Sequence, residues 1–184
     1  MTNEKILLHI SDTPDCIYPF IFKLIDRLEP NYIIHTGDLV DNVKIGVGAP
    51  LRFYERGLKK LIEGFEKRKK IKKYIIAGNH DSLELLSKIN KSADIISEGS
   101  ILRIEDINFG LAHHMERLSN QAPVNLYGHN NKILENIEFE DNDRIFLNGL
   151  LNINIILLPS LEIHQISYPL QTDSARKYKN LKLP

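Results

Sequence analysis

The sequence predicts an α/β fold in which short buried strands alternate with amphipathic helices. Three runs of branched apolar residues, at positions 5–10, 32–35 and 74–77, each stop at a polar residue. Between them lie two segments whose apolar residues recur at helical spacing. Such alternation of strand and helix is typical of an α/β domain.

The expected helices follow from the apolar stripes and their end signals. The first spans residues 17–28 and is ended by Pro30, and the second spans residues 51–65. A third helix is expected after Asp81, whose side chain could cap it, with Glu84 in the first turn.

The second half of the chain predicts strands with little helix. Strand-like runs occur at residues 101–104, 107–112, 124–127, 144–147 and 150–158. The Asn148-Gly149 pair between two of these runs is a typical two-residue hairpin signal. We therefore expect mostly antiparallel pairing here. Without an internal repeat or a linker, we expect one domain over residues 1–184.

Composition narrows the classes of function. The 24 basic and 24 acidic residues give zero formal net charge, which argues against a nucleic-acid coat. The basic run at residues 67–73 predicts a solvated helix end, and the acidic run at 135–143 a solvated turn.

No export or membrane segment is found. The single cysteine, Cys16, predicts a small core residue in a reducing compartment, and we expect a cytoplasmic location.

Polar residues that can bind metal follow five of the expected strands. They are Asp12, Asp38, Asn79, His113 and His129. In an open α/β sheet ligands bind beyond the carboxyl ends of the strands, so these side chains are expected to converge. Carboxylate, amide and imidazole groups together suit Mn²⁺, Fe²⁺, Zn²⁺ or Mg²⁺.

These residues stand in a set of ordered motifs. The blocks are Ser11-Asp12, Gly-Asp-Leu-Val-Asp-Asn at 37–42, Gly-Asn-His-Asp at 78–81, His113, Gly128-His129 and Pro159-Ser160. In this order they resemble the signature blocks of the calcineurin-like metallophosphoesterases. The resemblance implies a four-layer α/β/β/α sandwich with two mixed β-sheets and metals at the sheet ends.

The resemblance also implies a role for each matching residue. Asp38 would bridge two metals, and Asp12 would serve one of them. The other metal would be held by Asn79, His113 and His129. His80 would face the substrate and either stabilise the transition state or protonate the leaving oxygen. Asp81 would orient His80 through a hydrogen bond.

Two departures from the family pattern fall on one metal position. Pro14 and Asn131 stand where the family has histidines, which leaves Asp12, Asp38 and any oxygen that Asn131 supplies. This predicts one strong site and one weak, oxygen-rich site. We expect Mn²⁺ first, with Mg²⁺, Fe²⁺, Zn²⁺ or Ni²⁺ as alternatives, in one or two ions per chain.

The other histidines have simpler interpretations. His9 and His35 lie inside apolar strands and predict hydrogen-bonded core residues, and His164 predicts a surface residue. His114 neighbours His113, and a shift of register would exchange them as ligand. We favour His113 because it directly follows the expected strand.

The function predicted is hydrolysis of a phosphodiester or phosphomonoester by metal-activated water, with reduced or narrow activity as one outcome of the lost histidines. The partner expected is a phosphate-ester substrate rather than nucleic acid or membrane, and nothing indicates an oligomer. The alternative is a catalytically impaired protein of the same fold that acts as a binding scaffold. Nucleic-acid processing through the basic run ranks last, because few aromatic residues accompany it.

Overall fold

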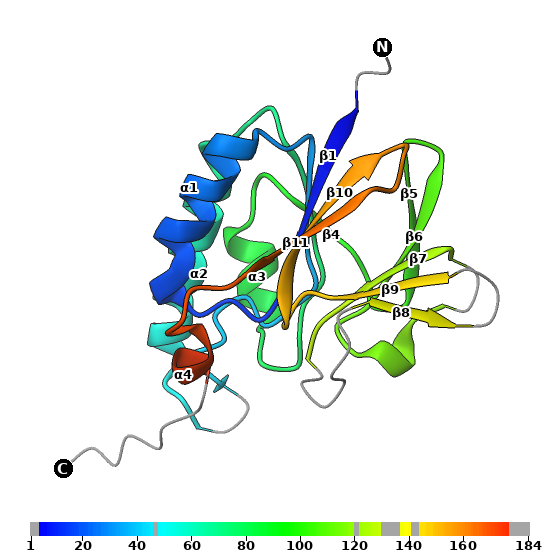
Figure 1. Ribbon diagram of the computed structural model, residues 1–184. Coiled ribbons are helices and arrows are strands. Elements are labelled where there is room, and N and C mark those ends of the chain that lie inside the picture. Colours follow the sequence, from blue (N-terminus) through cyan, green and yellow to red (C-terminus); the bar gives the residue numbers. More distant parts are fainter. Residues whose placement is uncertain (1–3, 46–47, 120–121, 130–136, 141–143, 177–184) are drawn as a thin grey trace.

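Two mixed sheets stack face to face, and sheet A lies between helices α1 to α3 and sheet B (Figure 1). The computed structural model describes residues 4–45, 48–119, 122–129, 137–140 and 144–176. Sheet A has six strands in the order β11-β10-β1-β2-β3-β4, and sheet B has five in the order β5-β6-β7-β9-β8. The prediction of an α/β fold with two mixed sheets is confirmed.

The strands are short. Those of sheet A are β1 (Lys5–Ile10), β2 (Tyr32–His35), β3 (Lys72–Ile75), β4 (Asp94–Ile95), β10 (Asn152–Leu158) and β11 (Ile163–Ser167). Those of sheet B are β5 (Ser100–Ile104), β6 (Ile107–Leu111), β7 (Val124–Tyr127), β8 (Ile137–Glu140) and β9 (Arg144–Asn148).

The helices are α1 (Tyr18–Leu28), α2 (Leu51–Glu66), α3 (Leu83–Ile89) and α4 (Thr172–Arg176), with 3-10 turns η1 (Asp15–Ile17) and η3 (Met115–Arg117). Helices α1, α2 and α3 lie on the outer face of sheet A (Figure 1). None of α1 to α4 contributes to the core between the two sheets.

Sheet A separates two hydrophobic cores. Leu8 and Ile33 face helices α1 and α2, whereas their neighbours Leu7 and Ile34 face sheet B. Successive side chains of a strand point to opposite faces, so a strand buried on both sides is apolar throughout. This double burial explains the unbroken apolar runs of the first half.

The strand pairing departs from the sequence prediction in the second half. Strand β5 is antiparallel to β6, as expected. Strand β8 lies within the acidic run predicted to be a solvated turn, and it is antiparallel to β9. Strand β7, however, is parallel to both β6 and β9. The prediction of mostly antiparallel pairing is therefore wrong for the centre of sheet B.

The hairpin predicted at Asn148-Gly149 does not form. Strand β9 belongs to sheet B and β10 to sheet A, so the chain crosses between sheets here. A Cβ at Gly149 would lie 2.7 Å from Nε2 of His9 and 2.9 Å from Cβ of Ser11. A glycine is needed at position 149 because the backbone there packs closely against β1 and the loop that follows β1, and not because of a tight turn.

The end of helix α1 at Leu28 is confirmed. Glu29 takes a left-handed backbone conformation there, and its N–H donates to the carbonyl of Ile25. Two smaller predictions are corrected. Strand β3 begins at Lys72 and ends at Ile75, two residues earlier than expected at each end. Cys16 is exposed rather than in the core.

The prediction that Asp81 caps α3 is wrong. Ser82 is the N-cap, and its hydroxyl accepts a hydrogen bond from the N–H of Leu85 at 3.3 Å. Glu84 lies in the first turn, as predicted. Asp81 is thereby free to serve the strand-end loops.

The basic run is only partly solvated. Helix α2 ends at Glu66, so the run continues through the following turn into β3. Arg68 pairs with Asp26 at 2.6 Å, and the buried Lys73 donates to the carbonyl of Arg68 at 2.7 Å. Two of the cations therefore stabilise the turn.

The two strand histidines are hydrogen-bonded core residues, as predicted. His9 contacts the Thr36 hydroxyl at 3.0 Å, and His35 contacts the Thr13 hydroxyl at 2.8 Å. Burial lowers the pKa of each to about 3, so both rings are neutral at pH 7.

In the part of the chain that the structure describes, no helix combines the length and apolar character needed to cross a bilayer.

Candidate metal centre

The predicted ligands meet where the two sheets present their strand ends. Asp12, Asp38 and Asn79 follow β1, β2 and β3 of sheet A, and His113 and His129 follow β6 and β7 of sheet B. Parallel pairing of β1, β2 and β3, and of β6 with β7, brings their carboxyl ends to common edges.

Three of these residues have an unusual backbone conformation. The φ angles are 52° at Asp12, 51° at Asp38 and 58° at His129. Left-handed conformations are costly for residues with a Cβ and concentrate at functional sites. Here they direct the side chains of the strand-end loops.

Hydrogen bonds tie the loops to one another. The N–H of Asp12 donates to the carbonyl of Gly37 at 2.9 Å. The N–H of His80 donates to Oδ1 of Asp38 at 3.0 Å, and the N–H of His129 donates to Oδ2 of Asp12 at 3.1 Å. The carboxylates are therefore held in place by backbone donors from other loops.

The His113 ring is fixed in one tautomer. Its Nδ1 lies 2.8 Å from the carbonyl oxygen of Thr36, which can only accept, so Nδ1 carries the proton. In the neutral ring Nε2 is then an acceptor. It faces Oδ1 of Asn79 at 3.0 Å and Oδ1 of Asp38 at 3.6 Å. Potential ligand atoms from three groups converge here, and a divalent cation would satisfy all of them.

The charges and pKa shifts of the buried groups also favour a bound cation. Asp12, Asp38 and His113 are buried, and one ligand atom from each lies within 4.8 Å of the others. Burial and the Asp38 carboxylate raise the pKa of Asp12. Burial lowers the pKa of His113, but the Asp12 and Asp38 carboxylates outweigh it, so the pKa is raised overall. The centre attracts positive charge, and its donors fit a divalent metal ion.

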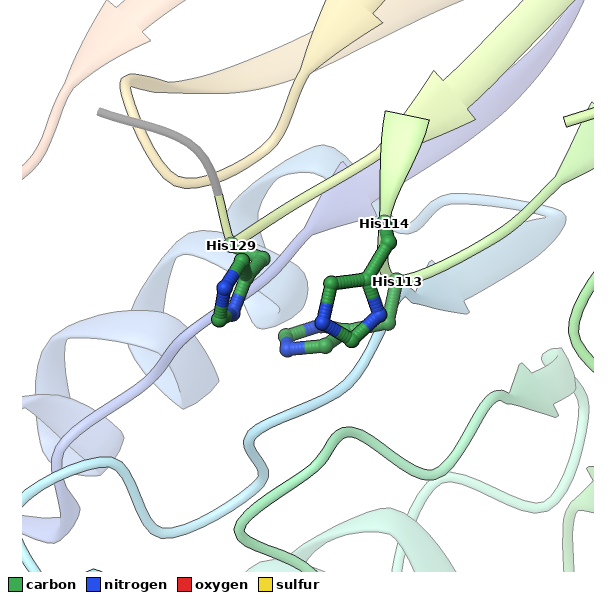
Figure 2. A group of neighbouring side chains, drawn as sticks. All are labelled: His113, His114 and His129. Atoms are coloured by element: carbon green, nitrogen blue, oxygen red, sulfur yellow. The ribbon is translucent and has the colours of Figure 1, made fainter. Parts of the chain in front are cut away.

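Figure 2 shows a group of three neighbouring histidines, His113, His114 and His129, which shares His113 with the carboxylate group. The ring centroid of His129 lies 5.0 Å from that of His113 and 4.2 Å from that of His114. His114 also contacts Oε1 of Glu98 through Nδ1 at 3.0 Å. The structure thus brings both candidates of the His113/His114 pair to the centre, and only His113 also joins the carboxylate group.

His80 lies at the wall of the cavity beside the centre. Its Nδ1 is buried and has no hydrogen-bond partner among the described residues. Burial lowers its pKa, with the Asp38 carboxylate acting in the opposite direction. The buried Nδ1 thus lacks the hydrogen-bond partner that such a group normally has, which sets this ring apart from His9 and His35.

The hydrogen bond expected from Asp81 to His80 is absent. Oδ1 of Asp81 accepts from the N–H of Leu39 at 2.9 Å and from the hydroxyl of Tyr54 at 3.0 Å. Oδ2 accepts from the N–H of Gly78 at 2.7 Å. Asp81 therefore joins the loops after β2 and β3, and burial and Asp38 raise its pKa to about 7.

An open cavity of about 430 Å³ lies over the centre. Its lining residues are Asp12, Asp38, Asp41, Lys44, His80, His129, Leu150, Leu151, Asp173 and Arg176. Sequence reasoning missed Asp41, Lys44, Asp173 and Arg176 as site residues. Asp41 lies within the block at 37–42 and could have been found from it, whereas no local pattern marks Arg176.

The depleted metal position has few ligands in the described residues. Pro14 is buried and offers no side-chain donor. Asn131 lies outside the described residues. His164 is exposed and pairs with Glu162 at 2.9 Å, which confirms its interpretation as a surface residue. Asp12 and Asp38 are the predicted ligands that remain.

Two stacked mixed sheets, with carboxylate, amide and imidazole donors at their strand ends, are the arrangement of the metallophosphoesterase fold. The chain belongs to the calcineurin-like phosphoesterase family, whose model matches residues 6–180. The solved structure of the phosphoesterase Yfce from E. coli covers 89% of this chain and 100% of its own, at 15% identity and TM-score 0.60. TT1561 of Thermus thermophilus covers 89% and 98%, at 9% identity and TM-score 0.54. None of the curated proteins matches the sequence.

Proposed function

We propose that this chain hydrolyses a phosphodiester or phosphomonoester with a divalent metal ion held by Asp38, Asn79, His113 and His129. The observation that carries the proposal is the convergence of acceptor atoms from His113, Asn79 and Asp38, which a cation would satisfy. Membership of the phosphoesterase family supports the reaction class.

Mn²⁺ is the metal we propose, because two oxygen and two nitrogen donors suit a borderline divalent ion. When bound, such an ion neutralises charge on the phosphate oxygens and makes water a nucleophile near neutral pH. A cytoplasmic location belongs to the same proposal.

The chain's own residues would position the ester. His80 lines the cavity beside Asp38, so its ring could donate to a phosphate oxygen or to the leaving oxygen. Asp81 is a positioning residue, because it holds the backbones of Leu39 and Gly78 beside Asp38 and Asn79. The open cavity predicts loose recognition of the leaving group.

The test uses the full chain loaded with Mn²⁺ and two substrates, an aryl phosphate monoester and an aryl phosphate diester. We expect hydrolysis of at least one, abolished by Asp38→Asn. The matched control is Asp106→Asn, which changes a carboxylate with 91% side-chain exposure outside the cavity lining. Folded, Mn²⁺-bound protein that cleaves neither ester would overturn the proposal and favour the binding scaffold.

A further inference from the structure

The cavity over the centre contains more acidic side chains than one metal site uses. Asp12 and Asp41 line it beside Asp38, and both are buried. With Pro14 in the family's ligand position, no imidazole from that loop balances them. Two basic side chains, Lys44 and Arg176, line the same cavity.

Arg176 is anchored from the C-terminal helix α4. Its Nε donates to the backbone carbonyl of Asp12 at 2.7 Å, and its Nη1 donates to that of Leu150 at 2.7 Å. The guanidinium stacks on the ring of Tyr168 at 4.5 Å. Because these partners are formally neutral, they fix the guanidinium without cancelling its charge.

The carboxylates near Arg176 neutralise it only in part. Its Nε lies 4.0 Å from Oδ2 of Asp41. Its Nη1 lies 3.1 Å from Asp173, whose side chain is 83% exposed, so solvent screens that pair. The charge of Arg176 is therefore felt in the cavity that it lines.

Lys44 approaches the same carboxylate from the loop after β2. Its ammonium pairs with Oδ1 of Asp41, while Arg176 lies near Oδ2. An ammonium has three donors, and the described residues give Lys44 this one carboxylate partner. Two cations thus flank Asp41 beside Asp12 and Asp38.

We propose that Lys44 and Arg176 act as fixed cations in place of a second metal ion and restrict the centre to one metal. The inference rests on the proposed function and deepens it. Like charges repel strongly where solvent is partly excluded, so a divalent ion beside Asp12 would meet both cations. The same cations would face the phosphate of a bound ester.

Metal stoichiometry tests this inference without using activity. The chain is equilibrated by dialysis with increasing Mn²⁺, and bound metal is counted by mass spectrometry. We expect one ion for the wild type. Lys44→Met removes one charge at similar side-chain length, and we expect it to bind a second ion at least tenfold more tightly than the wild type does. The matched control is Lys60→Met, which removes a lysine that pairs with Asp15 outside this cavity and should retain one ion.

A pair of Arg176 variants separates charge from anchoring. Arg176→Lys keeps the charge and should retain one ion, whereas Arg176→Met should admit a second. Circular dichroism checks that both fold, and Lys44→Met tests the inference if either does not.

The outcomes distinguish this inference from the proposed function. Two ions in the wild type, or one ion in both Lys44→Met and Arg176→Met, would overturn the fixed-cation inference and leave the phosphoesterase proposal standing. No ion in the wild type would remove the basis of both.

Discussion

The Nδ1 atom of His113 lies 2.8 Å from the carbonyl oxygen of Thr36, in the loop between β2 and Asp38. This contact joins the two sheets and assigns the ring proton to Nδ1. Nε2 is then the ring nitrogen that faces Asp38 and Asn79. The hydrogen bond from His113 to Thr36, which is not itself a metal ligand, thus orients the ring so that Nε2 can bind metal.

The first prediction separates the neighbouring histidines. His113→Ala should weaken Mn²⁺ binding by at least about 100-fold, because it removes a ligand that its own hydrogen bond orients. His114→Ala should change binding by less than about threefold, because His114 does not join the group that His113 forms with Asp12 and Asp38. Isothermal titration calorimetry measures both, and the reverse order would assign the ligand to His114.

The second prediction concerns the close packing of Gly78 against Asp38. A Cβ at Gly78 would lie 2.3 Å from the backbone nitrogen of Asp38 and 2.3 Å from its Oδ1. Gly78→Ala should therefore displace the carboxylate and reduce Mn²⁺ affinity at least tenfold, since a backbone clash has no rotamer that relieves it. The measurement is again calorimetric titration.

The control for that variant is Gly48→Ala. Gly48 has a φ of 95°, and nothing lies within 4 Å of the added Cβ. Backbone strain should lower the free energy of unfolding by about 1 kcal/mol and leave metal affinity unchanged. Equal loss of metal affinity in both variants would show that strain, rather than the contact with Asp38, is responsible.

The third prediction distinguishes the roles of His80 and Asp81. His80→Ala should lower kcat by about 100-fold or more with little change in Mn²⁺ affinity, as expected for a group that meets the substrate. Asp81→Asn should instead lower the free energy of unfolding by about 2 kcal/mol, because an amide group would face donors from Leu39, Tyr54 and Gly78. Denaturant unfolding and steady-state kinetics report the two effects. Unchanged stability in Asp81→Asn would contradict its positioning role.

The fourth prediction concerns pH. Burial lowers the pKa of His35 to about 3, whereas the unfolded chain has the ordinary value near 6.5. Its contribution to stability is therefore present above pH 6.5 and is lost as the pH falls toward 3. Relative to His35→Gln, the wild type should lose about 2 kcal/mol of unfolding free energy between pH 7.5 and pH 5. A difference between the two proteins that stays constant over this range would mean that His35 titrates normally in the fold.

Much of the centre is predictable from the sequence because its ligands follow strands. Each apolar run ends at the sheet edge where parallel strands gather, so Asp12, Asp38, Asn79, His113 and His129 can be identified in order. The core role of His9 and His35 is equally predictable from the sequence, because a histidine within a strand buried on both faces must be neutral and hydrogen-bonded.

Other features depend on tertiary packing that no local pattern records. Arg176 reaches the cavity only because α4 brings it against the carbonyls of Asp12 and Leu150. The Asn148-Gly149 pair satisfies a local hairpin rule, but the strands on either side belong to different sheets. The motif pattern assigns Asp81 to the neighbouring His80, whereas its acceptors are used by backbone groups from two loops and by Tyr54.

Anomalous diffraction from crystals soaked in Mn²⁺ tests the central claim most directly, because it locates each ion and counts them. We predict one peak, surrounded by Asp38, Asn79, His113 and His129. A peak held mainly by Asp12, with none beside His129, would contradict the ligand assignment.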